Sequence, residues 1–184
     1  MKATGIVRRI DDLGRVVIPK EIRRTMRIRE GDPLEIYTDR EGEVIFKKYS
    51  PIGELAGFAA EYAETLHKVC GISVLIFDRD AVIASAGVPR REYADKKMSE
   101  ALEEIAERRQ LYVRRGREER ILAVVDGGSH CLSCAMPIIT EGDMIGCVCS
   151  VTSDEEQNAP AISAESEAKL IQTAAGFLSK QMEN

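Results

Sequence analysis

The first 48 residues constrain the fold of this chain most, because they form a basic module too short to bury a sizeable core alone. Residues 1–48 carry 12 Lys and Arg against 9 Asp and Glu, whereas residues 49–184 carry 14 against 22. A basic end on a chain of net charge −5 indicates that a polyanion binds at one end only. The module has no cysteine to staple it. We therefore expect it to fold as an intimate homodimer.

Turn and strand patterns divide the beginning of this module. Thr4–Ile10 and Gly14–Ile18 predict two short strands, separated by the turn composition Asp11-Asp12-Leu13-Gly14. Pro19 suits the first turn of a helix, where its missing N–H is no loss. That helix is expected over Lys20–Ile28.

A hairpin is predicted to complete the module. Leu34–Thr38 and Val44–Lys48 alternate apolar and polar residues, and the polar run Asp39-Arg40-Glu41-Gly42-Glu43 joins them. The resulting order of two strands, a helix and two strands is compact but has little to bury by itself.

Ser50-Pro51 marks the boundary between two expected domains, residues 1–50 and 51–184. From Ile52 to Cys70 we expect a helix whose apolar residues alternate spacings of three and four, a heptad pattern. A long helix over Ser163–Met182 is expected to close the chain. Its apolar residues form two seams, so one seam can pack on the domain itself while the other needs a partner. The heptad residues are Ile52, Leu55, Ala59, Tyr62, Leu66 and Val69, and the seams are Ala168, Ile171, Ala175, Leu178, Met182 and Leu170, Ala174, Phe177.

Between these helices the pattern predicts an α+β domain. The expected elements are strands over Ser73–Asp78 and Ala81–Ala86, a helix over Met98–Arg109, and strands near Arg120–Asp126, Cys131–Ile139 and Met144–Thr152.

The basic residues of the module are candidates for DNA contact. The predicted DNA-binding residues are Arg8, Arg9, Arg15, Lys20, Arg23, Arg24 and Arg27. A solvated charged surface is the simpler interpretation of such a run. Two features favour DNA: arginine suits bidentate contact with phosphate and guanine, and a dimer would double the residues into one patch. No aromatic residue is interleaved with them, which favours duplex DNA over single strands.

The module resembles the DNA-binding domain of the AbrB-type transition-state regulators. The segments that carry the resemblance are Thr4-Gly5-Ile6-Val7-Arg8, Leu13-Gly14-Arg15-Val16-Val17-Ile18-Pro19, Glu21-Ile22-Arg23-Arg24 and Leu34-Glu35-Ile36-Tyr37. The resemblance implies a β-rich swapped-hairpin dimer, in which two chains interleave their strands. It also implies that Arg8, Arg15, Arg23 and Arg24 line the DNA-binding face. The same fold occurs in antitoxins of toxin–antitoxin pairs, which usually carry a short toxin-binding tail.

The second domain resembles a GAF domain, a small-molecule sensing fold. The resemblance rests on the segments Val74–Gly87, Pro137–Ile139 and Ile145–Cys149. It implies that any ligand sits between the sheet and the Tyr93–Arg109 region, but the fold alone does not identify that ligand. As a whole the chain resembles the stage V sporulation protein T family. That resemblance implies an activator and repressor of late, forespore-expressed sporulation genes.

Four cysteines of the second domain could in principle form a zinc or redox site, namely Cys131, Cys134, Cys147 and Cys149. Cys147 and Cys149 lie two apart on an expected strand, so both face one side, and the CxxC motif is single. Buried structural thiols are therefore the favoured interpretation. The rival is an enzyme, because some GAF-fold proteins reduce free methionine sulfoxide with cysteines. We expect no catalytic residue, metal or cofactor. His67 is interpreted as a helix-flank residue, and His130 has no evident nucleophile partner except Cys131.

Assembly and compartment follow from the same features. We expect a dimer through the first domain and a tetramer through a second contact in the other domain. No window of the sequence has the apolar length of a membrane span. The N-terminus lacks a hydrophobic signal core, and five cysteines then suggest reduced thiols in the cytoplasm.

Overall fold

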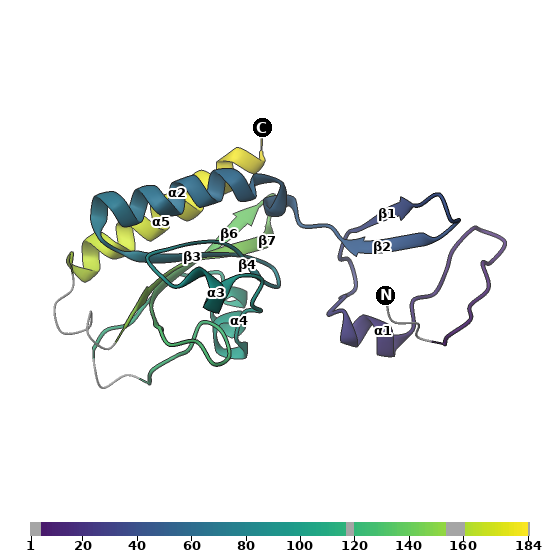
Figure 1. Ribbon diagram of the computed structural model, residues 1–184, viewed down its shortest axis with the longest axis horizontal. Helices are drawn as coiled ribbons and strands as arrows, with labels where there is room; N and C mark the ends of the chain where they lie inside the picture. Colours follow the sequence, from purple (N-terminus) through teal and green to yellow (C-terminus); the bar gives the residue numbers. More distant parts are fainter. Residues whose placement is uncertain (1–4, 117–119, 154–160, 184) are drawn as a thin grey trace. The chain divides into compact units, whose positions relative to one another are not determined.

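The structure is a computed structural model that describes residues 5–116, 120–153 and 161–183. The chain divides into two compact units, Met1–Tyr49 and Ser50–Asn184, whose elements are labelled in Figure 1. Within the described ranges, no helix combines the length and apolar character needed to cross a membrane.

The first unit contains one short helix and one hairpin. Helix α1 (Lys20–Thr25) follows Pro19 at its N-cap, as expected from the fixed φ of proline. Strands β1 (Leu34–Thr38) and β2 (Val44–Lys48) pair antiparallel, with Ile36 opposite Phe46. The predicted hairpin is therefore confirmed.

The two strands predicted before the helix are wrong for the single chain. Residues 5–10 and 15–19 form neither strand nor helix, and Thr4 lies outside the described residues. The turn between them does form, since the Asp11 N–H donates to the Arg15 carbonyl at 3.1 Å. A strand needs a neighbouring strand to accept and donate its main-chain hydrogen bonds, and among the described residues no strand pairs with these segments.

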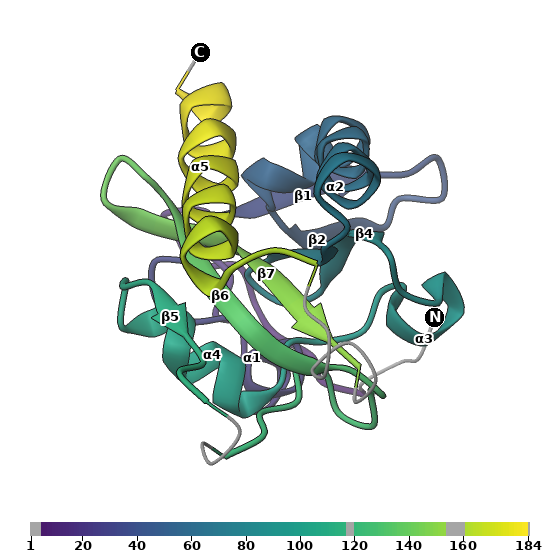
Figure 2. The ribbon, with the colours of Figure 1, turned by 90° about the vertical axis from the view of Figure 1, so that its left-hand side faces the viewer.

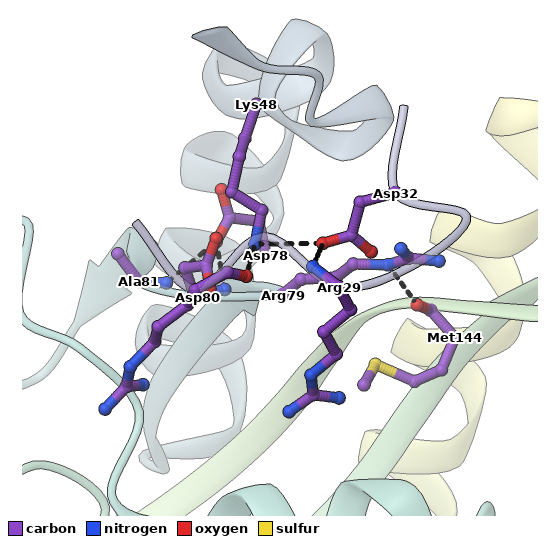
Figure 3. A network of polar contacts seen from close by, with 9 residues as sticks. Arg29, Asp32, Lys48, Asp78, Arg79, Asp80, Ala81 and Met144 are labelled. Carbon is purple, nitrogen blue, oxygen red and sulfur yellow. Dashed lines mark hydrogen bonds and ion pairs between the residues drawn. The ribbon is translucent and has the colours of Figure 1, made fainter. Parts of the chain in front are cut away.

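Helix α1 ends three residues earlier than predicted. Arg27 adopts a left-handed backbone with φ of 51°, which stops the helix, and the Ile28 N–H returns to the Arg23 carbonyl at 2.7 Å. Lys48 Nζ then donates to the Arg27 carbonyl at 3.0 Å and lies 3.6 Å from the Asp32 carboxylate, which also accepts the Arg29 N–H at 2.8 Å (Figure 3). The end of β2 is thereby tied to the segment after α1.

The second unit is built on a five-stranded antiparallel sheet. Its strand order is β4-β3-β7-β6-β5. The strands are β3 (Ser73–Asp78), β4 (Val82–Ala86), β5 (Tyr112–Val113), β6 (Cys131–Thr140) and β7 (Asp143–Thr152). The turn from β3 to β4 is closed by Asp78, whose carboxylate accepts the N–H groups of Asp80 and Ala81 at 2.7 Å (Figure 3).

Helices cover both faces of this sheet. The 3-10 helix η1 (Pro51–Leu55) leads into α2 (Ala56–Cys70), and α5 (Ala164–Met182) packs beside α2 on one face. Figure 2 shows these two helices together, with α3 (Arg90–Tyr93) and α4 (Glu100–Glu107) on the opposite side. The expected α+β architecture with two long flanking helices is confirmed.

Two apolar clusters fill the space on either side of the sheet. Beneath α2 and α5, one cluster includes Ile76, Val148 and Ile171, all fully buried. On the other face, Phe77, Tyr93 and Leu102 belong to a second cluster and are also fully buried. The region where the GAF resemblance implies a ligand, between the sheet and Tyr93–Arg109, is thus lined by buried apolar side chains.

The strand predicted near Arg120–Asp126 is wrong. Only an isolated bridge joins Ala123 to Cys131, and the edge of the sheet is instead β5. The reason is the start of α4: the Ser99 hydroxyl donates to the Ala123 carbonyl at 2.7 Å and the Ser99 N–H to the Val124 carbonyl at 2.9 Å. The main-chain carbonyls that a neighbouring strand would need as acceptors are therefore hydrogen-bonded to Ser99, the N-cap residue of α4.

The heptad pattern of residues 52–69 is partly used inside the unit. Ile52, Ala59 and Leu66 are buried in the unit's own core, whereas Val69 remains 77% exposed. On α5 the first predicted seam is buried except for the half-buried Met182, and in the second seam Ala174 is buried while Phe177 is 40% exposed. Periodicity alone could not separate residues that pack on the sheet from residues that face outward.

Candidate nucleic-acid interface

The seven basic residues predicted to contact DNA all have exposed side chains in the structure. They are Arg8, Arg9, Arg15, Lys20, Arg23, Arg24 and Arg27. Two lie on the segment before the first turn, one directly follows that turn, and four lie on or just beyond α1. Three consecutive pieces of chain therefore present cationic side chains to solvent, where a phosphate can reach them.

Asp11 builds the turn that precedes Arg15. One of its carboxylate oxygens accepts the N–H groups of Leu13 at 3.0 Å and Arg15 at 2.8 Å. The other accepts Arg15 Nε at 2.8 Å. These bonds, first the one from the Arg15 N–H, hold the pKa of Asp11 below its ordinary value. Gly14, with φ of 76°, supplies the left-handed backbone that the turn requires.

Helix α1 spaces its cationic residues by three and four positions. Lys20, Arg23 and Arg24 lie on the helix, and their spacing places them along neighbouring lines of its surface. Arg27 lies beyond the helix end in a left-handed conformation, so its side chain leaves in a direction that helical periodicity does not predict. Ile22 is half-buried and Met26 is 43% exposed. The apolar side of α1 is thus only partly covered within one chain.

Three cysteines of the second unit, Cys134, Cys147 and Cys149, are buried in its core. Burial raises the pKa of Cys134 to about 12 and the pKa of Cys149 well above its ordinary value. Cys147 and Cys149 are fully buried, with their sulfurs 3.6 Å apart. Thiolates are the nucleophiles and the metal ligands. Within the described ranges, no cluster of three His, Cys, Asp or Glu side chains could hold a metal ion.

One polar cluster was missed by the sequence analysis. The His130 Nδ1 lies 3.0 Å from both the Tyr93 hydroxyl and the Ser129 hydroxyl, and Glu92 accepts the Ser129 N–H. The His130 N–H also donates to the Tyr93 hydroxyl at 3.0 Å. Burial raises the pKa of Tyr93. These bonds fasten residues 129–130 to α3. No local signal reveals them, because the partners are 37 residues apart.

Two family models match this chain, one over each of its two units. Residues 54–183 match the family model described as "Stage V sporulation protein T C-terminal, transcription factor". Residues 7–53 match "Antidote-toxin recognition MazE, bacterial antitoxin". The transition state regulatory protein AbrB of Bacillus subtilis is 65% identical over 51 residues, which cover 28% of this chain and 52% of that protein.

A full-length relative and a solved structure extend the comparison. A solved structure of a methyl-accepting chemotaxis protein, residues 122 to 287, is 18% identical, covers 70% of this chain and 88% of that chain, and has a TM-score of 0.51. That likeness concerns the fold alone. Stage V sporulation protein T of Bacillus subtilis (strain 168) is 51% identical over 185 residues, which cover 100% of this chain and 99% of that protein. The chain therefore belongs to the stage V sporulation protein T family.

Proposed function

We propose that this protein is a sequence-specific regulator of transcription that binds duplex DNA through its first unit. The observation that carries the proposal is the set of seven exposed Lys and Arg side chains on three consecutive pieces of one small unit. The full-length relationship to a sporulation protein supports a role at late sporulation promoters, as activator at some and repressor at others. The protein would act on the nucleoid in the forespore cytoplasm.

Duplex DNA fits the side chains better than single-stranded nucleic acid. Proteins that bind single strands stack bases on aromatic rings. The aromatic residues of the first unit, Tyr37, Phe46 and Tyr49, lie in or just after the hairpin, away in sequence from the basic residues. Lys47 Nζ lies over the Tyr37 ring at 4.6 Å. The arginines instead suit phosphate oxygens and the guanine edge in the major groove.

A homodimer through the first unit completes this proposal. Val7 is 90% exposed, Ile10 is 69% exposed and Val17 is 70% exposed. These residues lie on the two segments that lack a strand partner. A second copy that contributed the same segments would bury the apolar side chains and pair the main chains, which is the swapped-hairpin arrangement. It would also double the number of arginines that face the DNA.

A second contact, through α2 and α5, would make a tetramer. Phe58, Tyr62 and Phe177 form an aromatic cluster across these helices, with the Tyr62 and Phe177 rings stacked at 5.6 Å between centroids. Gly57 and Gly176 leave open space where a side chain would project. Helical glycine is costly unless something approaches closely, which supports a partner helix on this face.

The second unit would serve regulation as well as assembly. A small-molecule ligand could affect DNA binding only by preferring one arrangement of α2 and α5, because a ligand indifferent to both states shifts nothing. Its expected site, between the sheet and the Tyr93–Arg109 region, is lined by buried side chains, among them Tyr93 and Leu102.

The two rival functions fit the observations less well. A cysteine-dependent reductase needs a thiolate, and burial raises the pKa of both Cys134 and Cys149. It also leaves the exposed arginines without a role. An antitoxin resembles this chain only over residues 7–53, whereas residues 54–183 match the sporulation family.

Arginine replacement tests the proposed function. Arg8, Arg15, Arg23 and Arg24 are replaced together by alanine, and the affinity for duplex DNA is measured as a function of salt. Each arginine lost should cost about 1–3 kcal/mol if it reads a base, or lower the salt slope by about one if it meets a phosphate. The matched control removes four exposed arginines of the second unit, namely Arg90, Arg91, Arg108 and Arg120. Equal affinities for the two variants would refute the assignment.

A further inference from the structure

The first unit contains the same five-residue turn twice. In Asp11–Arg15, the Asp11 carboxylate accepts the N–H groups two and four residues later at 3.0 and 2.8 Å. In Asp39–Glu43, the Asp39 carboxylate accepts the N–H groups two and four residues later at the same two distances, 3.0 and 2.8 Å. Gly14 and Gly42 both follow three residues after the aspartate, with φ of 76° and 85°. The main chain is therefore held in one way in both turns.

The two turns differ in the residue that closes them. Glu43 closes the second turn, whereas Arg15 closes the first and returns its Nε to the free carboxylate oxygen of Asp11 at 2.8 Å. The Arg15 side chain remains 70% exposed. Because the contact uses Nε, it leaves both terminal amino groups of the guanidinium for another acceptor. The aspartate that shapes the turn also fixes the direction of the arginine.

We infer that Asp11 is a positioning residue for DNA binding, which holds the Arg15 guanidinium in the orientation that meets the DNA. The inference rests on the proposed function and adds a role for an acidic residue within a cationic face. Among the described residues, the hydrogen bonds of the Asp11 carboxylate lie within residues 11–15, so one chain supplies every group of this arrangement. Ordering a long side chain before binding removes a cost that binding would otherwise carry.

The sign of the effect separates positioning from simple charge. A carboxylate near DNA repels phosphate, so its removal should tighten binding if charge alone mattered. Positioning requires the opposite result. Asp11→Asn is the sharp variant, because the asparagine carbonyl oxygen still accepts the two main-chain N–H groups while its amide nitrogen cannot accept Arg15 Nε. Asp39→Asn makes the same change of charge in the matching turn, where no arginine is held.

The experiment measures binding of the full-length variants to a DNA duplex selected from a random pool by the unaltered protein. Asp11→Asn should weaken binding about threefold to tenfold, the cost of ordering a free side chain. Asp39→Asn should leave it unweakened. In an Arg15→Ala background, Asp11→Asn should cause no further loss, and the NMR signal of Arg15 Nε–H should shift in Asp11→Asn but not in Asp39→Asn. Thermal melting of both variants checks that the turns persist.

The outcomes distinguish this inference from the function on which it rests. If Arg15→Ala weakens binding while Asp11→Asn leaves it unchanged or tightens it, the positioning role is refuted and the interface stands. Equal losses from Asp11→Asn with and without Arg15 also refute it. If neither Arg15→Ala nor the quadruple alanine variant weakens binding, the proposed interface itself is wrong.

Discussion

The two units of this chain bury their apolar residues in opposite ways. In the second unit, both faces of the sheet are covered, and fully buried side chains such as Phe77 and Ile171 lie on opposite sides of it. In the first unit, Val7, Val17 and Ile36 remain 90%, 70% and 65% exposed. The second unit is therefore stabilised by its own core, whereas the first leaves large apolar side chains exposed for the contact with another copy that we propose.

The largest expected effect comes from a charge placed on the exposed apolar surface of the first unit. If Val17 faces solvent, Val17→Asp is nearly harmless, since surface changes alter stability by about 0.5 kcal/mol or less. If a second copy buries it, the variant leaves an unpaired buried charge and should abolish dimerisation and DNA binding. Size-exclusion chromatography with light scattering and a DNA-binding assay measure both.

A matched substitution in the second unit gives the control. Ile121 is 54% exposed on a unit with its own core, so Ile121→Asp should leave mass and DNA binding unchanged. A fully active, unaltered oligomer of Val17→Asp would contradict the contrast between the two units.

The next effect is confined to the second unit. A Cβ added at Gly146 would lie 2.3 Å from the main-chain carbonyl oxygen of Phe77, and a main-chain atom cannot move aside as a flexible side chain does. Gly146→Ala should therefore destabilise this unit by about 1–3 kcal/mol. Hydrogen exchange should show faster opening of β3 and β7, with residues 34–48 unchanged. Uniform loss of protection in both units would show that they unfold as one.

The same contrast explains which elements could be predicted from sequence. The Asp11–Gly14 turn, the helix start at Pro19 and the hairpin of β1 and β2 depend on neighbours in sequence, so their local signals sufficed. The strands predicted over residues 4–10 and 14–18 depend on pairing with another strand, and no strand among the described residues pairs with them. The prediction of a strand near residues 120–126 was wrong because a residue distant in sequence, Ser99, donates hydrogen bonds to the main-chain carbonyls of Ala123 and Val124.

Part of the candidate site could likewise be predicted from the sequence, and part of it could not. The seven basic residues could be predicted from charge and composition, and all seven are exposed. The role inferred for Asp11 could not be predicted from the sequence, because an acidic residue in a basic run only lowers the net positive charge of that run. Its contact with Arg15 depends on the shape of the turn, which the sequence indicates only by the glycine three residues later.

A smaller effect sharpens the second proposed contact. A Cβ at Gly176 meets nothing within 4 Å in one copy, so Gly176→Ala should stabilise an isolated helix by about 1 kcal/mol. If α2 and α5 meet another copy there, the added methyl should instead weaken association and shift the tetramer toward the dimer. Light scattering across a dilution series measures the oligomer mass and so distinguishes the two outcomes. A higher melting temperature with unchanged mass would remove Gly176 from the contact.

The smallest effect is the acid dependence of exposed carboxylates in the two units. Hydrogen bonds from Arg15 lower the pKa of Asp11 in the first unit, and the hydrogen bond from Lys68 lowers the pKa of Glu64 in the second. A lowered pKa means that the unfolded chain takes up the proton first as pH falls. The stabilising contribution is therefore complete above the ordinary carboxyl pKa and is lost as pH falls through the lowered value. NMR titration of both side chains measures this. Arg15→Ala should raise the pKa of Asp11 and leave Glu64 unchanged, and a titration of Asp11 that does not respond to Arg15→Ala would mean that the guanidinium is not held there in solution.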